Sequence, residues 1–287
     1  MLGPSLAATL KVAGTEHPLR ISGVVDARIS CMSERIYVVT GSASGIGAAT
    51  VARLVDGGHR VIGADIRDAD VIADLATKKG RQTLVEEVRS ASGGRIDGVI
   101  ACAGISSGDP VTVSINFFGS VSTLQGLRPF LMRSEQPRAA TISSIALLQS
   151  VDDDIVDACL CDDEDSARAA AEGKGVFVYP STKRALARWI RRTASTKPWA
   201  GAGIPLNAVA PGVVTTPMTA PLLDDPTWRD IVDDSVPMPL GGYARPEEIA
   251  AVLDWLTSPD NTKVTGQVLF VDGGADAVLR PDDIWTT

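Results

Sequence analysis

The chain has 287 residues, of which 45% are hydrophobic, and this length can bury the core of one large α/β domain. Its formal net charge of -8 disfavours binding to nucleic acid or to an acidic membrane, because such a surface repels polyanions. The sequence contains no run of about 18 apolar residues that could cross a bilayer, and no secretory signal. We therefore expect a cytoplasmic protein that does not contact a membrane.

The first 31 residues show no regular hydrophobic pattern, whereas Met32 to Arg35 lead directly into a β-branched run. We therefore expect residues 1–31 to be a disordered extension whose removal leaves activity unchanged. Residues 32–287 are expected to form a single domain, because no linker or internal repeat interrupts them.

Residues that usually bind metals or assist nucleophiles are few and scattered. Neither histidine, His17 or His59, lies near a plausible nucleophile in the sequence, which disfavours a His-dependent hydrolase. No metal site is expected, because the cysteine spacing fits no zinc pattern. Reduced thiols are expected at all four cysteines: Cys31, Cys102, Cys159 and Cys161.

From Ile36 onward, short β-branched runs alternate with helical stretches, a pattern typical of βαβ units. The predicted strands are 35–40, 60–65, 70–73, 97–101, 139–143, 204–209 and 267–271. The predicted helices are 45–57, 77–91, 111–133, 179–195 and 246–257. The expected fold is therefore a single-domain α/β fold of Rossmann type, with a doubly wound parallel sheet of about seven strands and helices on both faces.

One acidic segment breaks this alternation. Eight of the fourteen residues from 152 to 165 are acidic, and an alanine-rich stretch that can form a helix follows at 167–171. We interpret the region around 147–175 as an inserted excursion on the protein surface.

A glycine-rich turn follows the first predicted strand and opens the first predicted helix. Its glycines can permit the tight turn, the approach of the backbone to a pyrophosphate, and close packing of helix on strand. The free N–H groups and the positive end of the helix can then bind the diphosphate. This context favours a dinucleotide site over a purely structural turn in Thr40-Gly41-Ser42-Ala43-Ser44-Gly45-Ile46-Gly47.

Asp65 ends the second predicted strand, 18 residues beyond Gly47. Its carboxylate can accept hydrogen bonds from the adenosine ribose hydroxyls and would repel a 2′-phosphate. NAD is therefore the expected cofactor rather than NADP, with Arg67 as the nearby feature that opposes this preference. The alternative is that Asp65 is a solvated acid at a strand end.

The spacing Thr-Gly-x3-Gly-x-Gly resembles the short-chain dehydrogenase/reductase family. This resemblance implies further cofactor contacts from Asp74 and Leu75 beside the adenine, and from Ala103 and Gly104 after the fourth strand. The common family form at the latter position is Asn-Asn-Ala-Gly. Cys102 departs from it, so that loop is expected to lose stabilising side-chain bonds.

Tyr179 and Lys183 are four residues apart, so they share one face of the predicted helix 179–195. An adjacent cation favours the phenolate of a tyrosine, whose ordinary pKa is about 10. Tyr179 could then take the proton of a secondary alcohol as hydride leaves for nicotinamide, or return it. The resemblance also places both side chains against the cofactor, whereas a Tyr-x3-Lys pair alone mostly marks a solvated helix face.

The resemblance implies two more catalytic residues. Ser144, at the end of predicted strand 139–143, would hydrogen-bond the reacting oxygen, with Ser143 as the alternative. Asn116 would support a helix bend and a proton-relay water, although a purely structural role is the alternative.

The turn after the sixth predicted strand resembles the family turn that holds the nicotinamide carboxamide. Thr216 is assigned the side-chain contact, and the other assigned residues of this turn are Pro211, Gly212 and Val214. Ser144 and Tyr179 are 35 positions apart, farther than is usual in the family, because the acidic segment intervenes. Loop insertions are tolerated at low entropic cost, so the two side chains can still meet.

Three stretches are similar to the bacterial 3α-hydroxysteroid dehydrogenase/carbonyl reductase subgroup of the family: the acidic insertion, Asp65 to Leu75 and Val271 to Pro281. The resemblance implies an NAD(H)-dependent enzyme that interconverts a lipophilic secondary alcohol and a ketone, with a 3α-hydroxysteroid or carbonyl compound as a candidate substrate. It also implies a homodimer or homotetramer.

Segment 215–242 carries apolar residues that either line a site for a lipophilic substrate or anchor the segment to the core: Met218, Leu222, Leu223, Trp228, Val236, Met238 and Leu240.

Other functions remain as alternatives. The enzyme could act on aryl allylic (coniferyl-type) or other alcohols. A non-catalytic nucleotide-binding regulator is disfavoured because Ser144, Tyr179 and Lys183 are all present. A lyase or epimerase that uses bound NAD transiently is disfavoured by the glycine spacing.

Overall fold

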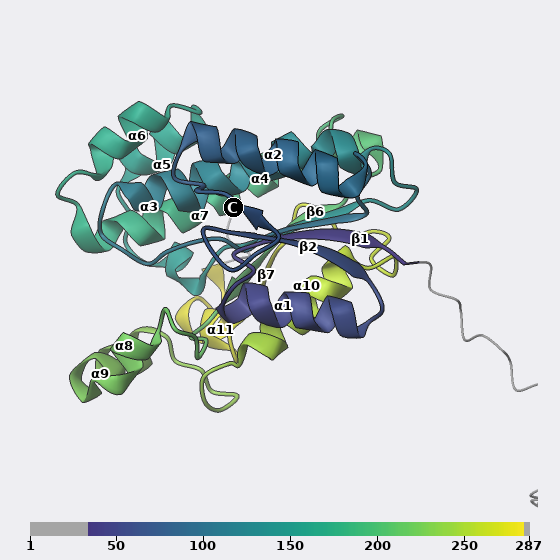
Figure 1. Ribbon diagram of the computed structural model, residues 1–287. Helices are drawn as coiled ribbons and strands as arrows, with labels where there is room; N and C mark the ends of the chain where they lie inside the picture. Colours follow the sequence, from purple (N-terminus) through teal and green to yellow (C-terminus); the bar gives the residue numbers. More distant parts are fainter. Residues whose placement is uncertain (1–33, 284–287) are drawn as a thin grey trace, which may run out of the picture. The chain divides into compact units, whose positions relative to one another are not determined.

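A parallel sheet forms the centre of the computed structural model, which describes residues 34–283 (Figure 1). The predicted extension at 1–31 lies outside these residues. The strand order is β3-β2-β1-β4-β5-β6-β7, so the direction of winding reverses between β1 and β4. The strands are β1 (Ile36–Thr40), β2 (Arg60–Asp65), β3 (Val71–Ile72), β4 (Gly98–Ala101), β5 (Arg138–Ile142), β6 (Leu206–Pro211) and β7 (Val268–Val271).

Helices cover both faces of the sheet, as Figure 1 shows. On one face lie α2 (Lys78–Ser92), α4 (Ser120–Leu131) and α7 (Val178–Thr193), and on the other lie α1 (Gly45–Asp56) and α10 (Pro246–Thr257). The shorter elements are α3 (Val111–Val113), η1 (Ser114–Gly119), η2 (Ile145–Leu148), α5 (Asp153–Leu160), α6 (Glu164–Ala171), η3 (Gly175–Phe177), η4 (Ala200–Ala202), α8 (Ala220–Asp224), α9 (Pro226–Ser235) and α11 (Ala275–Leu279).

Strand β1 shows why its sequence is apolar throughout. Val38 packs into the core under α2 and α4, whereas Tyr37 and Val39 pack into the core under α1 and α10, and all three are fully buried. A parallel strand covered on both faces needs apolar residues at successive positions rather than at alternate ones. The predicted Rossmann-type fold is confirmed, and each predicted strand starts and ends within two residues of an observed one.

The helix predicted for 111–133 is divided in the structure, at the residue where the resemblance implied a bend. A π-helical turn, η1, separates α3 from α4, and it carries Asn116. Both polar atoms of the Asn116 side chain bind the backbone of Ile105, the carbonyl oxygen and the N–H group each at 2.9 Å. Such turns are rare inside α-helices and are frequent at functional sites.

The interpretation of the acidic segment as a surface excursion was also incomplete. Helices α5 and α6 form a pair, which we call the acidic hairpin (residues 153–171). Its inner face packs against Phe117 of η1 and Val178 of α7. The inner face consists of side chains that are at most 1% exposed: Ile155, Val156, Cys159, Ala167 and Ala171.

Segment 215–242, which we call the flap, contains α8 and α9 and extends beyond the sheet in Figure 1. Leu223 and Val236 anchor it, because both are buried in a small cluster with Ile145. Met218 and Trp228 are 45% and 50% exposed. Some apolar residues of the flap therefore anchor it to the core, whereas others stay exposed.

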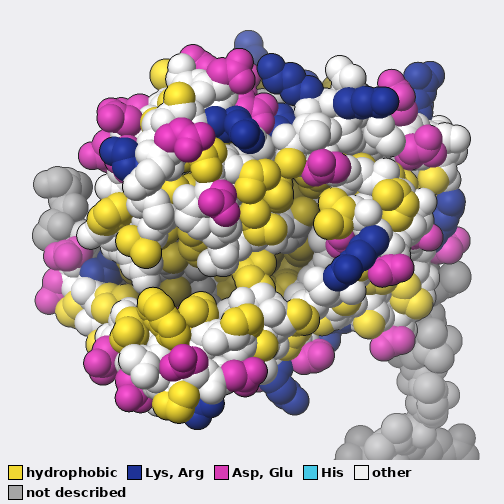
Figure 2. Space-filling model, turned by 60° about the vertical axis from the view of Figure 1, so that its left-hand side comes forward, with side chains coloured by type: hydrophobic (Ala, Val, Ile, Leu, Met, Phe, Trp, Pro, Cys, Tyr) yellow, Lys and Arg dark blue, Asp and Glu magenta, His cyan; other side chains and the backbone are white. Residues whose placement is uncertain are grey.

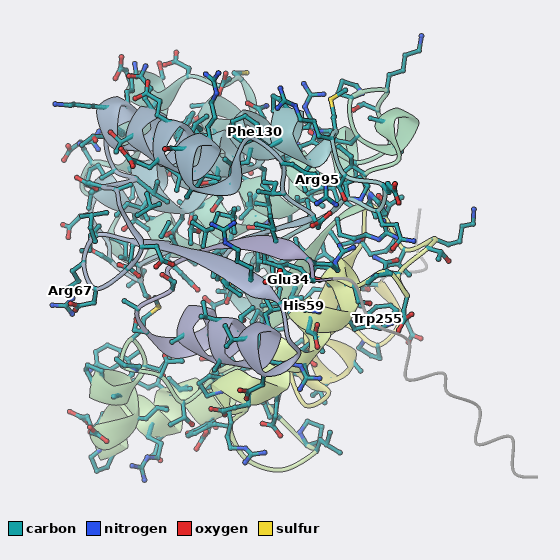
Figure 3. The ribbon with its side chains drawn as sticks, turned by 45° about the vertical axis from the view of Figure 1, so that its right-hand side comes forward. Glu34, His59, Arg67, Arg95, Phe130 and Trp255 are labelled. Atoms are coloured by element: carbon teal, nitrogen blue, oxygen red, sulfur yellow. The ribbon has the colours of Figure 1, made fainter. Side chains whose placement is uncertain are left out.

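His59 lies at the opposite end of the sheet from Arg67, which follows the carboxyl end of β2 (Figure 3). Its ring stacks at 5.3 Å from that of Tyr37, at the start of β1. This position excludes His59 from chemistry at the carboxyl end, and His17 lies outside the described residues. No described helix is both long and apolar enough to cross a membrane.

Candidate functional site

A cavity of about 270 Å³ opens at the carboxyl end of the sheet, where the loops after β1, β2, β4, β5 and β6 meet. Figure 2 shows a hollow on this side of the molecule with many hydrophobic side chains around it. Open α/β sheets bind ligands at such a position, outside the strand ends where the winding reverses. All the predicted site residues except Asn116 line the cavity.

The glycine-rich turn forms one wall, and two of its glycines, Gly41 and Gly47, leave no room for a side chain. Gly41 has a φ of 68°, and a Cβ atom there would lie 2.9 Å from the backbone of Ala103. A Cβ atom on Gly47 would lie 2.0 Å from the Gly41 carbonyl oxygen, so the start of α1 packs directly on the turn. The backbone thus forms a cradle of the kind that a diphosphate needs.

Asp65 stands at the far end of this wall. Its carboxylate accepts hydrogen bonds from the N–H groups of Ala43, at 3.1 Å, and Ile66, at 2.7 Å. These bonds hold the carboxylate at the cavity rim, beside the glycine turn. Asp74 and Leu75 line the same end of the cavity.

The structure distinguishes between the two candidate serines. Both serines line the cavity, and the Ser144 hydroxyl accepts a hydrogen bond from the Ala146 N–H group at 3.2 Å and acts to lower the pKa of the neighbouring Tyr179 phenol. Ser143 is only 1% exposed, and its hydroxyl donates to the backbone carbonyl of Lys183 at 3.0 Å. This geometry favours Ser144 as the residue that would contact a reacting oxygen, and gives Ser143 a part in fixing α7.

Burial dominates the ionisation of the tyrosine and the lysine. Desolvation raises the pKa of Tyr179 above its ordinary value, and the hydrogen bond with Ser144 opposes this only in part. Desolvation lowers the pKa of Lys183 to about 8. The Lys183 Nζ atom lies 5.5 Å from the centre of the Tyr179 ring and donates to the Ile142 carbonyl, and burial rather than this cation sets the direction in which the Tyr179 pKa is shifted.

Asn116 lies behind the cavity wall rather than in it. Besides its bonds to Ile105, its side-chain N–H group donates to the Thr182 hydroxyl at 3.2 Å. A Cβ atom on Gly104 would lie 3.1 Å from the Asn116 Oδ1 atom and 3.6 Å from the Lys183 Nζ atom. The structural role is therefore visible, and the side chain also stands next to the lysine.

Comparisons with known proteins agree with this geometry. Residues 35–155 match a family model described as short chain dehydrogenase, and residues 164–276 match one described as Enoyl-(Acyl carrier protein) reductase. A 3-alpha-hydroxysteroid dehydrogenase/carbonyl reductase of Comamonas testosteroni is 38% identical over 255 residues, which are 86% of this chain and 98% of that protein. The chain belongs to the short-chain dehydrogenase/reductase family.

Two further relatives support this assignment. A crystal structure of the 3-alpha-hydroxysteroid dehydrogenase from Pseudomonas sp. B-0831, complexed with NADH, has a TM-score of 0.80 and 39% identity and covers 86% of this chain and 99% of that one. A cis-4-hydroxycyclohexanecarboxylate dehydrogenase of Sinomonas cyclohexanicum is 31% identical over 86% of this chain and 98% of that protein. The chain is accordingly an oxidoreductase that acts on CH–OH groups.

In this short-chain dehydrogenase/reductase, the turn after β6 closes the cavity opposite the glycine turn. Pro211, Gly212, Val214 and Thr216 all line it, as predicted. A Cβ atom on Gly45 would lie 3.4 Å from the Thr216 side chain, so the two turns face each other closely.

Sequence reasoning missed several residues at the site. Thr219 lines the cavity and holds the turn, because its hydroxyl donates to the Val214 carbonyl at 2.5 Å and accepts from the Thr216 N–H group at 3.0 Å. Adjacency to predicted residues was the available signal for the others, which are Ile105, Ile115, Ile142 and Pro217. Met218, which the sequence offered as a lining residue, also lines the cavity.

Arg184 was also missed, and it explains how the dehydrogenase tolerates its long insertion. From helix α7, its guanidinium donates to the carbonyl oxygens of Leu147, at 2.7 Å, and Gln149, at 2.8 Å. These bonds fasten the segment after Ser144 to the helix of Tyr179. The two side chains therefore meet although 35 positions separate them.

Proposed function

We propose that this protein is an NAD(H)-dependent dehydrogenase that interconverts a neutral, lipophilic secondary alcohol and its ketone, with 3α-hydroxysteroids as the first candidate substrates. The main observation in support of this proposal is that Ser144, Tyr179 and Lys183 line one cavity at the carboxyl end of the sheet. The names of the Comamonas and Pseudomonas relatives support the steroid class.

The catalytic roles follow from positions and chemistry. Tyr179 takes the hydroxyl proton of the alcohol, and returns it to the ketone oxygen in the reverse direction. Ser144 donates a hydrogen bond to that oxygen and holds it beside the phenol. NAD⁺, when bound, supplies the acceptor for the hydride that leaves the alcohol carbon. Asn116 holds the loop at Ile105 and stands beside Lys183, at the position where a proton relay would pass.

The residues that would hold the cofactor fit a dinucleotide. Gly41, Ser44, Gly45, Ile46 and Gly47 would cradle its diphosphate. Its adenosine half would contact Asp65, Asp74 and Leu75, and its nicotinamide half would contact Ala103, Gly104, Tyr179, Lys183, Pro211, Gly212, Val214 and Thr216.

Asp65 supports NAD rather than NADP, because its carboxylate is held at the cavity rim beside the glycine turn, where it could accept hydrogen bonds from the ribose hydroxyls. Replacing it by Ala removes the charge that repels a 2′-phosphate. We expect the ratio of kcat/KM for NAD⁺ to that for NADP⁺ to fall about tenfold in Asp65→Ala. Asp56→Asn, an exposed acid at the end of α1, is the control and should leave the ratio unchanged.

The reacting end of the cavity supports a neutral substrate. Its apolar wall includes Ile105, Ile115 and Met218. Among the described lining residues the charged ones are Asp65 and Asp74, at the adenosine end, and Lys183. Lys183 is only 4% exposed and its ammonium donates to the Ile142 carbonyl at 3.0 Å, so it would not receive a substrate carboxylate.

The test is NADH formation by the purified protein with NAD⁺ and three sets of alcohols: 3α-hydroxysteroids, aryl allylic alcohols and simple secondary alcohols. We expect steroid turnover that falls by about a hundredfold or more in Tyr179→Phe, which keeps the ring and removes the proton carrier. NAD binding should persist in this variant. Turnover of aryl allylic alcohols alone would reject the steroid class, and retained activity in Tyr179→Phe would reject the mechanism.

A further inference from the structure

The guanidinium of Arg81, in α2, joins the acidic hairpin to the wall of the cavity. Its Nε atom donates to the backbone carbonyl of Leu75 at 2.8 Å. Its two terminal nitrogens bind the two carboxylate oxygens of Glu164, the first residue of α6, at 2.8 and 2.5 Å. Both side chains are nearly buried, Arg81 at 8% and Glu164 at 11% exposure.

The same guanidinium reaches two more elements. It lies within 3.4 Å of the backbone carbonyl oxygens of Ala76 and Ser114, and 6.0 Å from the centre of the Phe118 ring. Arg168, on the next turn of α6, donates to the Ser114 hydroxyl at 2.8 Å. The hairpin is therefore bonded to the first residue of the π-helical turn as well as to Arg81.

Leu75 connects these hydrogen bonds to the cofactor site, because it lines the cavity at the end assigned to adenosine. Arg81 holds its carbonyl oxygen from one side. From another side, a Cβ atom on Gly119 would lie 3.1 Å from the Leu75 Cβ atom, so the end of η1 packs directly on it. A shift of Arg81 would thus change the position of this wall.

The ion pair stays charged despite its burial. Desolvation favours the neutral form of Glu164, but hydrogen bonds from Arg81 and Ser114 and the nearby charges of Arg81 and Lys78 hold its pKa below the ordinary value. A buried pair of this kind is weak evidence for a gain in stability, and removal of one partner leaves the other charge uncompensated. The clearer effect of this ion pair is to fix the orientation of the Arg81 guanidinium, and with it the directions of its five N–H donors.

We propose that Glu164 is a positioning residue for the adenosine half of the cofactor: through Arg81 it holds the Leu75 wall, and so the acidic hairpin sets the affinity for the dinucleotide. This inference rests on the proposed NAD(H) function. It gives the acidic hairpin a role at the cofactor site, although none of its residues lines the cavity.

The test measures binding of ADP-ribose, the adenosine part of NAD without nicotinamide, to the full chain by isothermal titration calorimetry. We expect the Kd to rise about tenfold in Glu164→Ala, with a smaller rise in Glu164→Gln, which retains an acceptor for Arg81. In kinetics, the KM for NAD⁺ should rise in parallel, whereas the KM for the alcohol and the kcat at saturating NAD⁺ should stay unchanged.

Asp157→Asn is the matched control. Asp157 also belongs to the hairpin and pairs with Arg188 of α7 at 3.6 Å, but its side chain is 70% exposed and the pair does not touch the cavity wall. If Glu164→Ala does not fold, the double variant Arg81→Met/Glu164→Leu replaces the pair by apolar side chains of similar size and leaves no buried charge. It should fold and still bind ADP-ribose weakly.

The outcomes separate the two proposals. Failure of the unmodified protein to bind ADP-ribose would overturn the proposed NAD(H) function. Binding to the unmodified protein with an unchanged Kd in the variants would overturn the role of Glu164 and leave the function intact. An equal rise in the KM for the alcohol would show general damage to the fold, which also overturns the positioning role.

Discussion

The acidic hairpin and the flap are both helical segments near the cavity, and the hairpin, which is the more acidic of the two, is the more deeply buried. The hairpin is rich in carboxylates, yet Ile155, Val156 and Cys159 on its inner face are at most 1% exposed. The flap has fewer acids, yet its helix α9 has no buried residue, and Trp228 and Ile231 are about half exposed. The number of acids alone therefore does not tell which segment belongs to the core.

Because of this difference in burial, the two segments have different roles around the site. The hairpin packs against η1 and α7, which carry Asn116 and Tyr179, so it behaves as part of the scaffold. The flap offers exposed apolar side chains next to Met218, which lines the cavity. Apolar surface that the fold does not use is available to a lipophilic substrate.

The largest expected effect is on stability, and it compares one isoleucine from each segment. Ile155→Ala removes a fully buried side chain of the hairpin, and we expect the free energy of unfolding to fall by about 3 kcal/mol. Ile231 in the flap is 48% exposed, so Ile231→Ala should change the free energy of unfolding by no more than about 0.5 kcal/mol. Urea denaturation measures both. Equal losses would contradict the division into scaffold and flap.

A second prediction concerns pH and the tyrosine that the scaffold buries. Because burial raises the pKa of Tyr179, the phenol stays protonated at neutral pH. Alcohol oxidation needs the phenolate, so its kcat/KM should increase with pH, by up to about tenfold per unit. Ketone reduction needs the phenol and should stay constant until the pH approaches that pKa. Oxidation rates that are flat between about pH 7 and pH 9 would show that the cation lowers the pKa after all.

The smallest effect is expected in the flap. Trp228→Ala should raise the KM for a bulky lipophilic alcohol about fivefold, because a half-exposed apolar surface is lost to the substrate. The melting temperature and the KM for a small secondary alcohol should not change. A drop in melting temperature would mean that Trp228 anchors the flap instead.

The fold was readable from the sequence because its signals are local. Each strand is a short apolar run, and the turn after β1 needs glycines for steric reasons that Gly41 and Gly47 display directly. The cavity-lining residues followed from motifs of the same local kind. The interruption of the helix at Asn116 was implied only by the family resemblance and not by the local pattern, since it depends on bonds to Ile105 in a preceding loop.

The long-range contacts could not be predicted from the sequence for the same physical reason. Arg81 and Glu164 are 83 positions apart, and Arg184 binds carbonyl oxygens 37 and 35 positions before it. Backbone acceptors carry no sequence signature. The buried face of the hairpin did have one, because Ile155, Val156 and Cys159 recur at helical spacing, but the surrounding carboxylates obscured it.

Those carboxylates have a further consequence for the charge of the whole molecule. Asp152 and Asp163 cap the starts of α5 and α6, and the first turns of the two helices contain Asp153, Asp154, Glu164 and Asp165. Acids at these positions accept hydrogen bonds from the free N–H groups and interact favourably with the positive end of the helix dipole. Without these six carboxylates the formal net charge of -8 would be -2. Most of the excess negative charge thus comes from the way two short helices begin, and not from an acidic surface spread over the protein.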